Sequence, residues 1–139
     1  MNFKVILDEG AYLPCRAYET DAGYDLWTPR RVVVHRNDSV VIDTGVHILI
    51  DEGMFGKIES KSGLNTNHSV VSHGGVVDSG YTGSIRVKMY NHGGKDYIFE
   101  KGDKIAQIIF HRYEAPKFEL VNELEETKRG NNGFGSSGR

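Results

Sequence analysis

The segment Gly74–Asn91, GGVVDSGYTGSIRVKMYN, decides the fold that we expect for this chain. Its two apolar arms, Val76–Val77 and the alternating Ile85–Met89, flank a turn that is rich in serine and glycine. Apolar residues that alternate with polar ones around such a turn predict a β-hairpin. Asp78 ends the first arm and Tyr81 follows three residues later. Taken alone, these side chains are typical of a turn-forming acid and a packed aromatic ring.

Short apolar runs separated by turn residues continue on both sides of this hairpin. No segment keeps a 3.6-residue apolar period over a dozen positions, so we expect only one short helical turn, at Ser62–Asn67, with Ser62 as its N-cap. Many short strands at regular spacing predict an all-β sandwich, jelly roll or barrel. The expected strands lie at Phe3–Leu7, Val32–Val34, Val40–Ile42, Val46–Ile50, Met54–Ser60, Tyr97–Phe99, Ile105–Phe110 and Phe118–Val121, whereas the segment AGYDL at residues 22–26 is typical of a turn.

The chain of 139 residues is long enough for one domain with a real core and too short for two. Its composition changes after Leu124, where glycine, asparagine and serine replace most of the apolar residues. Such a segment has too little apolar surface to form a core of its own. We therefore expect a β domain over residues 1–124 and a mobile C-terminal tail over residues 125–139.

The net charge of −2 gives the chain no general attraction to nucleic acid or to an anionic membrane. Cys15 is the only cysteine, which excludes a disulfide framework and a zinc site built from cysteines. The six histidines lack the paired spacing of a helix-borne metal site, so we interpret them as surface or satisfied residues. The N-terminal segment has no long apolar run. We expect a soluble, cytoplasmic protein that binds neither nucleic acid nor a membrane.

Two segments carry side chains that suit phosphate. Lys61–Gly63 offers a cation, a hydroxyl and a glycine N–H that an anion can approach closely. In the tail, Arg129 is a guanidinium fork, and Gly133–Gly138 surrounds Phe134 with hydroxyl and N–H groups. A phenylalanine between glycines can fold over a planar base and stack on it. Asp25 could hold a hydrated Mg²⁺, an ion that needs only one or two carboxylates plus phosphates.

Five motifs occur in order between residues 22 and 138: AGYDL, SKSGL, GGVVDSGYTG, GDKIAQIIF and RGNNGFGSSG. In sequence and spacing they resemble the five motifs of the homotrimeric dUTP pyrophosphatases (dUTPases). The resemblance implies a distorted jelly roll, or β-sandwich-like barrel. It also implies Mg²⁺-assisted hydrolysis of dUTP to dUMP and pyrophosphate. That activity keeps uracil out of DNA and supplies dUMP for thymidylate synthesis.

The resemblance also implies a role for each matched residue. Asp78 would activate the water that attacks the α-phosphorus, Gln107 would help to hold that water, and Asp25 would belong to the Mg²⁺ shell. Three chains of a homotrimer would share each site, one giving the hairpin, a second the phosphate-binding loops and a third the tail. The residues that would contact base and sugar are Gly75, Val76, Val77, Tyr81, Arg86 and Phe134. Those that would bind phosphates are Lys61, Ser62, Gly63, Arg129, Gly135, Ser136 and Ser137.

The chain departs from the family pattern at three positions. Lys61 replaces the usual arginine of the second motif, which keeps the charge but loses the bidentate fork. Gly80 stands where a second acid is common, and Ser137 stands where threonine is common. Because Asp78 and Tyr81 are intact, we expect the activity to survive these changes.

Two other functions remain open on the sequence. A dCTP deaminase has the same fold, but its chemistry needs a glutamate where this chain has Lys88. A nucleotide-sensing regulatory protein would use the same site to control a partner, usually through an inserted segment that this chain lacks. Steady-state turnover with a panel of nucleotides separates these functions.

Overall fold

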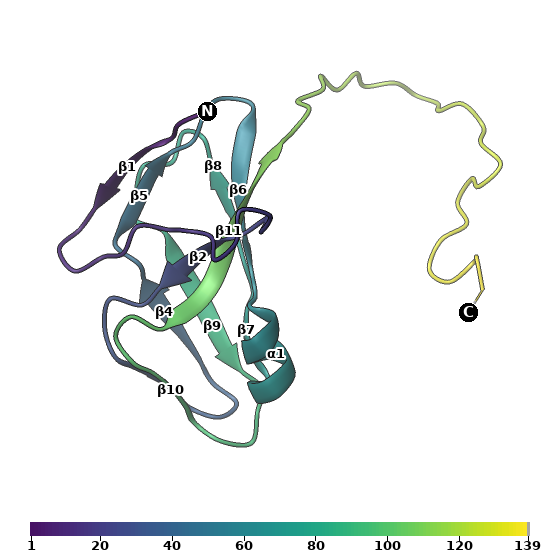
Figure 1. Ribbon diagram of the computed structural model, residues 1–139. Helices are drawn as coiled ribbons and strands as arrows, with labels where there is room; N and C mark the ends of the chain where they lie inside the picture. The colour runs from purple at the N-terminus through teal and green to yellow at the C-terminus, as the bar shows by residue number, and fades with distance from the viewer. Residues whose placement is uncertain (139) are drawn as a thin grey trace.

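Almost all regular structure consists of β-strands in the computed structural model of the chain, which describes residues 1–138 (Figure 1). One short helix interrupts the strands, so the all-β prediction is confirmed. The elements are β1 (Lys4–Leu7), β2 (Tyr24–Trp27), β3 (Val32–Val34), β4 (Ser39–Asp43), β5 (Val46–Leu49), β6 (Met54–Glu59), α1 (Ser62–His68), β7 (Val70–Ser72), β8 (Val76–Asp78), β9 (Arg86–Asn91), β10 (Tyr97–Phe99) and β11 (Lys104–Arg112).

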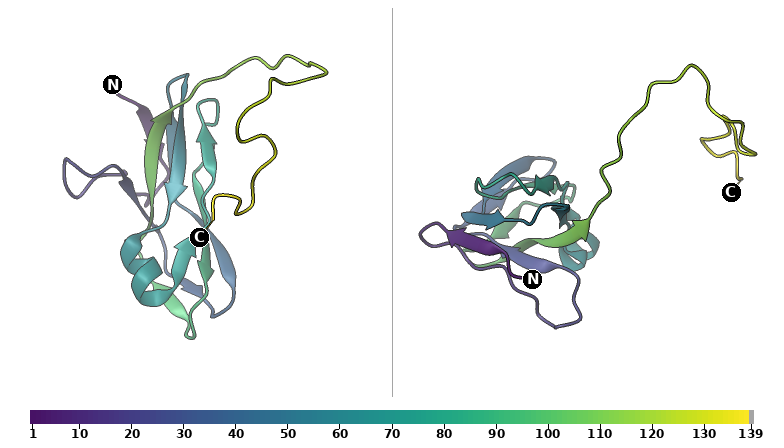
Figure 2. Two further views of the ribbon diagram at one scale, coloured as in Figure 1. Left: turned by 90° about the vertical axis from the view of Figure 1, so that its right-hand side faces the viewer. Right: turned by 90° about the horizontal axis from the view of Figure 1, so that it is seen from above.

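The strands pair antiparallel in two larger sheets and two small ones. The four-stranded sheet has the order β2–β11–β6–β8, and the three-stranded sheet has the order β4–β9–β7. β1 pairs with β5, and β10 pairs with β3. Neighbours along the chain are seldom neighbours in a sheet, as expected for a jelly-roll-like fold. Figure 2 shows these strands gathered into one body, from which the C-terminal segment extends.

Alternation of apolar and polar residues explains which side of each strand lies in the core. In β9, Val87, Met89 and Asn91 are buried while Arg86 and Lys88 are exposed. Each large apolar side chain that is fully buried contributes about 1.5–3 kcal/mol to stability. The core consists of Leu26, Val32, Val34, Ile42, Val46, Ile48, Ile50, Met54, Ile58, Val70, Val77, Ile85, Val87, Met89, Phe99, Ile105, Ala106 and Ile108.

The predicted hairpin over Gly74–Asn91 is wrong, because its two arms belong to different sheets. β8 pairs with β6, whereas β9 pairs with β4 and β7. The backbone of Ile85, just before β9, is bonded elsewhere: its N–H donates to Val46 O at 2.9 Å, and its carbonyl accepts from Thr44 N at 3.0 Å. The connection between the arms is also longer than the two to five residues of common hairpin loops.

Three smaller predictions were tested by the same elements. The helical turn after Ser62 is confirmed as α1, but its N-cap is Lys61 and not Ser62. Two strands were not predicted. β7 follows α1 after Ser69, and a three-residue run carries little periodicity. β2 corrects the interpretation of AGYDL as a turn, because its two buried residues, Asp25 and Leu26, are adjacent and give no alternating pattern. No strand forms at Phe118–Val121 in the part of the chain that the structure describes, and the Phe118 side chain is 97% exposed.

After β11 the chain leaves the body as an extended arm, which we define as residues 114–138 (Figures 1 and 2). Its large apolar side chains, Phe118, Leu120, Leu124 and Phe134, are exposed almost fully. The tail prediction over residues 125–139 falls within this arm except for residue 139, which lies outside the described residues. The division at residue 124 stays a prediction. Among residues 1–138, no helix is long and apolar enough to cross a membrane.

Gly74→Ala should destabilise the fold, because a Cβ at Gly74 would lie 1.9 Å from the carbonyl oxygen of Ile58. Relieving this clash requires β6 and the segment before β8 to separate. We expect a loss of about 1–3 kcal/mol in the free energy of unfolding, measured by urea titration. The adjacent variant Gly75→Ala is the control, since its Cβ would meet no atom within 4 Å. Equal stability of the two variants would contradict this packing.

Candidate active site

Asp25 lies at the centre of a charged cluster on the outer face of the four-stranded sheet. Its side chain is nearly buried, and its two carboxylate oxygens accept hydrogen bonds from Lys61 and Lys104. The Lys104 Nζ atom lies 2.8 Å from Asp25 Oδ2. Both lysine side chains keep part of their surface open to solvent. We call these three residues the lysine–carboxylate cluster.

Strand register brings the cluster together. Asp25 in β2 is opposite Gln107 in β11, and Gln107 is in turn opposite Glu59 in β6. Lys61 follows two residues after Glu59, and Lys104 begins β11. Three of the five sequence motifs therefore meet at one edge of the sheet. Lys104 was not predicted as a site residue, although it lies within the fourth motif, GDKIAQIIF.

The charges of the cluster favour an anion. Burial alone would raise the pKa of the Asp25 carboxyl, but hydrogen bonds from Lys104 and Lys61 outweigh it and hold that pKa below its usual value. The bond to Asp25 raises the pKa of Lys104 in return. These pKa shifts keep Asp25 and Lys104 charged at neutral pH. The cluster contains two lysines and one carboxylate, which leaves one formal positive charge in excess.

Gln107 packs tightly beside the cluster. Its Nε2 donates to the carbonyl oxygen of Ser60 at 3.0 Å, which fixes the side chain over the end of β6. A Cβ at Gly23 would lie 2.0 Å from Gln107 Oε1, so only glycine leaves room for this conformation. This contact explains the glycine of AGYDL without reference to any ligand.

A cavity of about 230 Å³ lies between β8 and the start of β9. Asp78, exposed at the end of β8, lines it together with Tyr81 and the backbone of Gly75–Val77. The structure thus brings Asp78 together with all the residues predicted for base and sugar except Phe134. Ile58 and Ile85 also line the cavity, and we did not predict them because they read as core residues.

The loop beside this cavity is ordered around Tyr81. The phenolic Oη donates to Ser84 O at 2.8 Å, and the Tyr81 N–H donates to Asp78 O at 3.0 Å. The ring lies directly over Gly83, where a Cβ would be 2.6 Å from ring atoms. The aromatic ring, Gly83 and Ser84 therefore form one packed unit at the mouth of the cavity.

The cavity and the lysine–carboxylate cluster are separated within one chain. Asp78 is opposite Phe55 near one end of β6, whereas Gln107 is opposite Glu59 at the other end. Four residues along a strand correspond to about 13 Å. Figure 1 shows the same separation, with β8 and α1 toward opposite ends of the body. One chain therefore does not bring Asp78 and Gln107 into a single site.

The tail residues predicted to bind substrate lie outside the body. Arg129 Nε donates to Asn132 O at 2.9 Å, within the arm itself. Phe134 is fully exposed and has a positive φ of 51°. Gly135, Ser136 and Ser137 follow it in turns of the same segment, so a single chain places none of them at the cavity.

A direct metal site fits poorly at Asp25. A cation there would have to displace both ammonium groups from the carboxylate. Within residues 1–138, no group of three or more His, Cys, Asp or Glu side chains could hold a metal ion. Any Mg²⁺ would therefore take most of its ligands from water and phosphate oxygens, as this ion commonly does. The assignment of Asp25 to the metal stays a prediction, restricted to contact through water.

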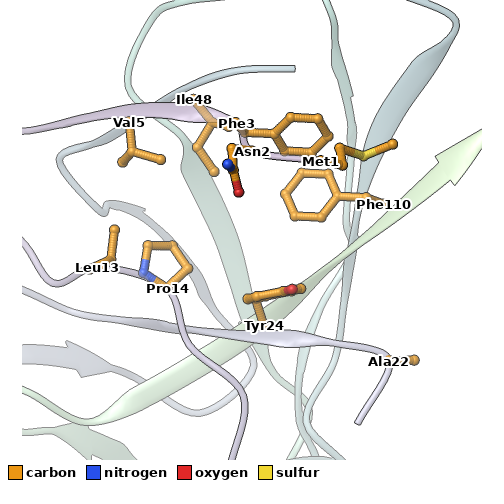
Figure 3. A pocket seen from close by; sticks show the side chains of 10 residues that line it. All are labelled: Met1, Asn2, Phe3, Val5, Leu13, Pro14, Ala22, Tyr24, Ile48 and Phe110. Carbon is orange, nitrogen blue, oxygen red and sulfur yellow. The ribbon is translucent and has the colours of Figure 1, made fainter. Parts of the chain in front are cut away.

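An apolar hollow of about 430 Å³ lies on another part of the surface (Figure 3). Phe3 and Phe110 meet edge to face with ring centroids 5.0 Å apart, and Tyr24 packs against Phe110 from the other side. No charged side chain lines it. Its lining residues are Met1, Asn2, Phe3, Val5, Leu13, Pro14, Ala22, Tyr24, Ile48 and Phe110.

Comparison with known proteins agrees with the motifs. A model of the dUTPase family matches residues 9–138. The probable deoxyuridine 5'-triphosphate nucleotidohydrolase of Schizosaccharomyces pombe is 40% identical, over 95% of this chain and 94% of its own. The deoxyuridine 5'-triphosphate nucleotidohydrolase of Swinepox virus is 41% identical, over 96% and 94%. A mutant dUTPase of Staphylococcus bacteriophage 80alpha with dUpNHpp superimposes with a TM-score of 0.93, at 29% identity and 99% coverage of both chains.

The jelly-roll-like fold and the names of these relatives identify a nucleotide hydrolase. The chain belongs to the dUTPase family.

Asp25→Asn should lower the free energy of unfolding by about 1–3 kcal/mol at pH 7, because two ammonium groups lose their shared counter-charge. The pKa of Asp25 is lowered in the folded state. Its stabilisation is therefore present above the ordinary carboxyl pKa of about 3.9 and is lost as the pH falls through the lower folded value. We expect urea unfolding between pH 3 and 8 to show a constant difference in the free energy of unfolding between wild type and Asp25→Asn above pH 5. This difference should shrink below pH 4.

The control for this substitution is Asp51→Asn, at an exposed turn, where we expect a change within about 0.5 kcal/mol. If Asp25→Asn were as stable as the wild type at pH 7, the cluster would make no net contribution to the fold.

Proposed function

We propose that the chain hydrolyses dUTP to dUMP and pyrophosphate, with Asp78 activating the attacking water. The observation that carries this proposal is the 230 Å³ cavity, where Asp78 and Tyr81 meet the backbone of Gly75–Val77. The family of the chain defines the reaction, and the cavity supports the residue roles.

Asp78 suits the role of base. It is exposed, and among the described residues no protein group donates a hydrogen bond to its carboxylate, which leaves its oxygens available to a water molecule. A carboxylate can align that water and accept its proton during attack on the α-phosphorus. Gln107 of a neighbouring chain would hold the same water with its amide group.

Selectivity for deoxyuridine follows from a narrow cavity lined by backbone and by Tyr81. Backbone groups near Gly75–Val77 and Arg86 would pair with uracil, and cytosine would present a donor where uracil has an acceptor. Such a mispairing costs about 1–3 kcal/mol or more. The 5-methyl group of thymine would press on the backbone, and Tyr81 against the deoxyribose would leave no room for a 2′-hydroxyl.

The lysine–carboxylate cluster would bind the phosphates. Its excess positive charge and the Ser62 and Gly63 groups that follow Lys61 supply donors for anionic oxygens. Mg²⁺, when bound to the triphosphate, neutralises charge that builds up on the phosphate oxygens. Arg129, Gly135, Ser136 and Ser137 of the arm would complete the phosphate contacts, with Phe134 stacked on uracil.

The assembly proposed here is a homotrimer with shared sites. Asp78 and Gln107 lie too far apart in one chain to hold the same water, so the cavity of one copy needs the cluster of another. The arm also needs a partner, because Phe118 and Leu120 are exposed almost fully. The apolar hollow around Phe3 and Phe110 on a second copy is a surface of matching chemistry (Figure 3).

The observed surroundings of Lys88 do not suit the deaminase alternative. Its ammonium group lies 5.4 Å from the centroid of the Tyr90 ring, where the positive charge faces the aromatic face. A cation that packs on a ring cannot replace the glutamate that shuttles protons at cytosine. No ammonia should therefore form from dCTP.

Asp78→Asn should keep its affinity for a non-hydrolysable dUTP analogue while turnover falls by about 10²-fold or more. Turnover is measured as pyrophosphate release with dUTP, dCTP, dTTP and UTP in the presence of Mg²⁺. The wild type should act on dUTP with little action on the other three nucleotides. If Asp78→Asn kept a turnover close to that of the wild type, Asp78 would not be the catalytic base. If the wild type hydrolysed UTP as fast as dUTP, Tyr81 would not exclude the 2′-hydroxyl.

Mixing two inactive proteins should restore activity if sites are shared. One protein lacks residues 129–139, and the other carries Asp78→Asn; after co-refolding, some trimers contain an intact cavity and an intact arm from different chains. Deleting residues 129–139 should leave thermal stability nearly unchanged, because Phe134, the only large apolar side chain among residues 129–138, is fully exposed. Partial recovery of turnover in the mixture is the expected result, and no recovery at any ratio would rule out the shared arrangement.

A further inference from the structure

The loop that carries Tyr81 is held from outside by residues of the β4–β5 region. Asp43, at the end of β4, accepts a hydrogen bond from the Ser84 hydroxyl and another from Gly45 N at 3.0 Å. His47, in β5, lies with Nδ1 2.8 Å from the carbonyl oxygen of Thr82. Thr82 is the residue immediately after Tyr81, so this contact acts on the backbone next to the aromatic ring.

The second nitrogen of His47 faces a carboxylate. Nε2 lies 3.1 Å from Asp8 Oδ1, and the backbone of Asp8 is fixed by a bond from its N–H to Gly45 O at 2.8 Å. A peptide carbonyl and a carboxylate are both acceptors. A neutral imidazole has one N–H and can donate to only one of them, whereas the imidazolium donates to both.

We propose that His47 is a positioning residue for Tyr81, and that its protonated form fixes the loop through the Thr82 carbonyl while Asp8 orients the ring. The proposal rests on the role proposed above for Tyr81 against the deoxyribose. His47 does not line the cavity, and its two ring nitrogens face the Thr82 carbonyl and the Asp8 carboxylate. It therefore acts on sugar selectivity through the backbone and is not itself a catalytic residue.

The charges around His47 favour the imidazolium. The hydrogen bond to Thr82 O, followed by the one to Asp8, raises the pKa of His47, and Asp43 adds a second negative charge nearby. The adjacent cation, Arg86 at the start of β9, lies 3.7 Å from Asp43 and partly balances it. Because the pKa of His47 is raised, both of its hydrogen bonds, to Thr82 and to Asp8, are present below the ordinary histidine pKa of about 6.5. One of them is lost as the pH rises through the higher folded value.

The experiment compares wild type, His47→Ala and His47→Gln from pH 5.5 to 9. The readout is the ratio of kcat/KM for dUTP to that for UTP, with KM and kcat resolved separately. In the wild type this ratio should fall by about threefold to tenfold as His47 loses its proton, the scale of one hydrogen bond. His47→Ala should give a low ratio at every pH, mainly through a lower KM for UTP, because a mobile Tyr81 no longer excludes the 2′-hydroxyl. His47→Gln, which keeps one donor, should be intermediate and show no titration over this range.

Two controls bracket the result. His35→Gln removes another histidine that is paired with an aspartate, Asp96, at 2.9 Å. His35 lies just after β3, which pairs with β10 and not with the Tyr81 loop, so the ratio of this variant should follow the wild type. Gly83→Ala pushes on the Tyr81 ring from inside the loop and should lower the ratio regardless of pH.

A measurement without substrate separates this proposal from the proposed function. Amide hydrogen exchange at residues 81–84 should accelerate by about threefold to tenfold in His47→Ala, and histidine NMR should show a raised pKa for His47 that Asp8→Asn lowers. Unchanged exchange, or a pKa unaffected by Asp8→Asn, would overturn the positioning role. If hydrogen exchange accelerates in His47→Ala while the wild type does not distinguish dUTP from UTP, His47 does fix the loop. The role proposed for Tyr81 in sugar selectivity is then wrong.

Discussion

A carboxylate that is nearly buried between two ammonium groups constrains the rest of this structure. Asp25 can remain charged in that place only because Lys61 and Lys104 both donate to it. These lysines come from the end of β6 and the start of β11, so the ion pairs tie three strands of one sheet at a single edge. The same contacts hold two cations in place, which would lower the entropy lost in the proposed binding of phosphate.

Most of the strands could be predicted from sequence because apolar alternation records which face of each strand is buried. β6 and β9 illustrate this, with every second side chain in the core. The pairing of β8 and β9 could not be predicted. Ile85 bonds to Thr44 and Val46, about forty residues away, and local alternation contains no information on such distant partners.

The candidate site divides in the same way. The resemblance of the motifs to the family identified the residues that line the cavity except Ile58 and Ile85, which are apolar and do not differ in type from other core residues. Lys104 and His47 were missed because each acts through a partner distant in sequence, Asp25 for one and Thr82 for the other. Composition predicted the tail from residue 125 but not the start of the arm at residue 114, because Phe118–Val121 has the apolar character of a strand. In the proposed assembly, the surface that would receive the arm belongs to another copy of the chain.

The arm has one more consequence, for the lifetime of the protein in a cell. A long exposed segment without secondary structure is a preferred substrate for proteases, whereas the β body resists them until it unfolds. A single cut after β11 would remove the arm and leave the body folded. Antibodies against the body would still detect this shortened protein. In the proposed trimer with shared sites, loss of one arm would inactivate the site of a neighbouring chain. The measured activity would then fall below the value expected from the amount of protein. Under the proposed contacts, bound nucleotide would order the arm and shield the peptide bonds most exposed to cleavage.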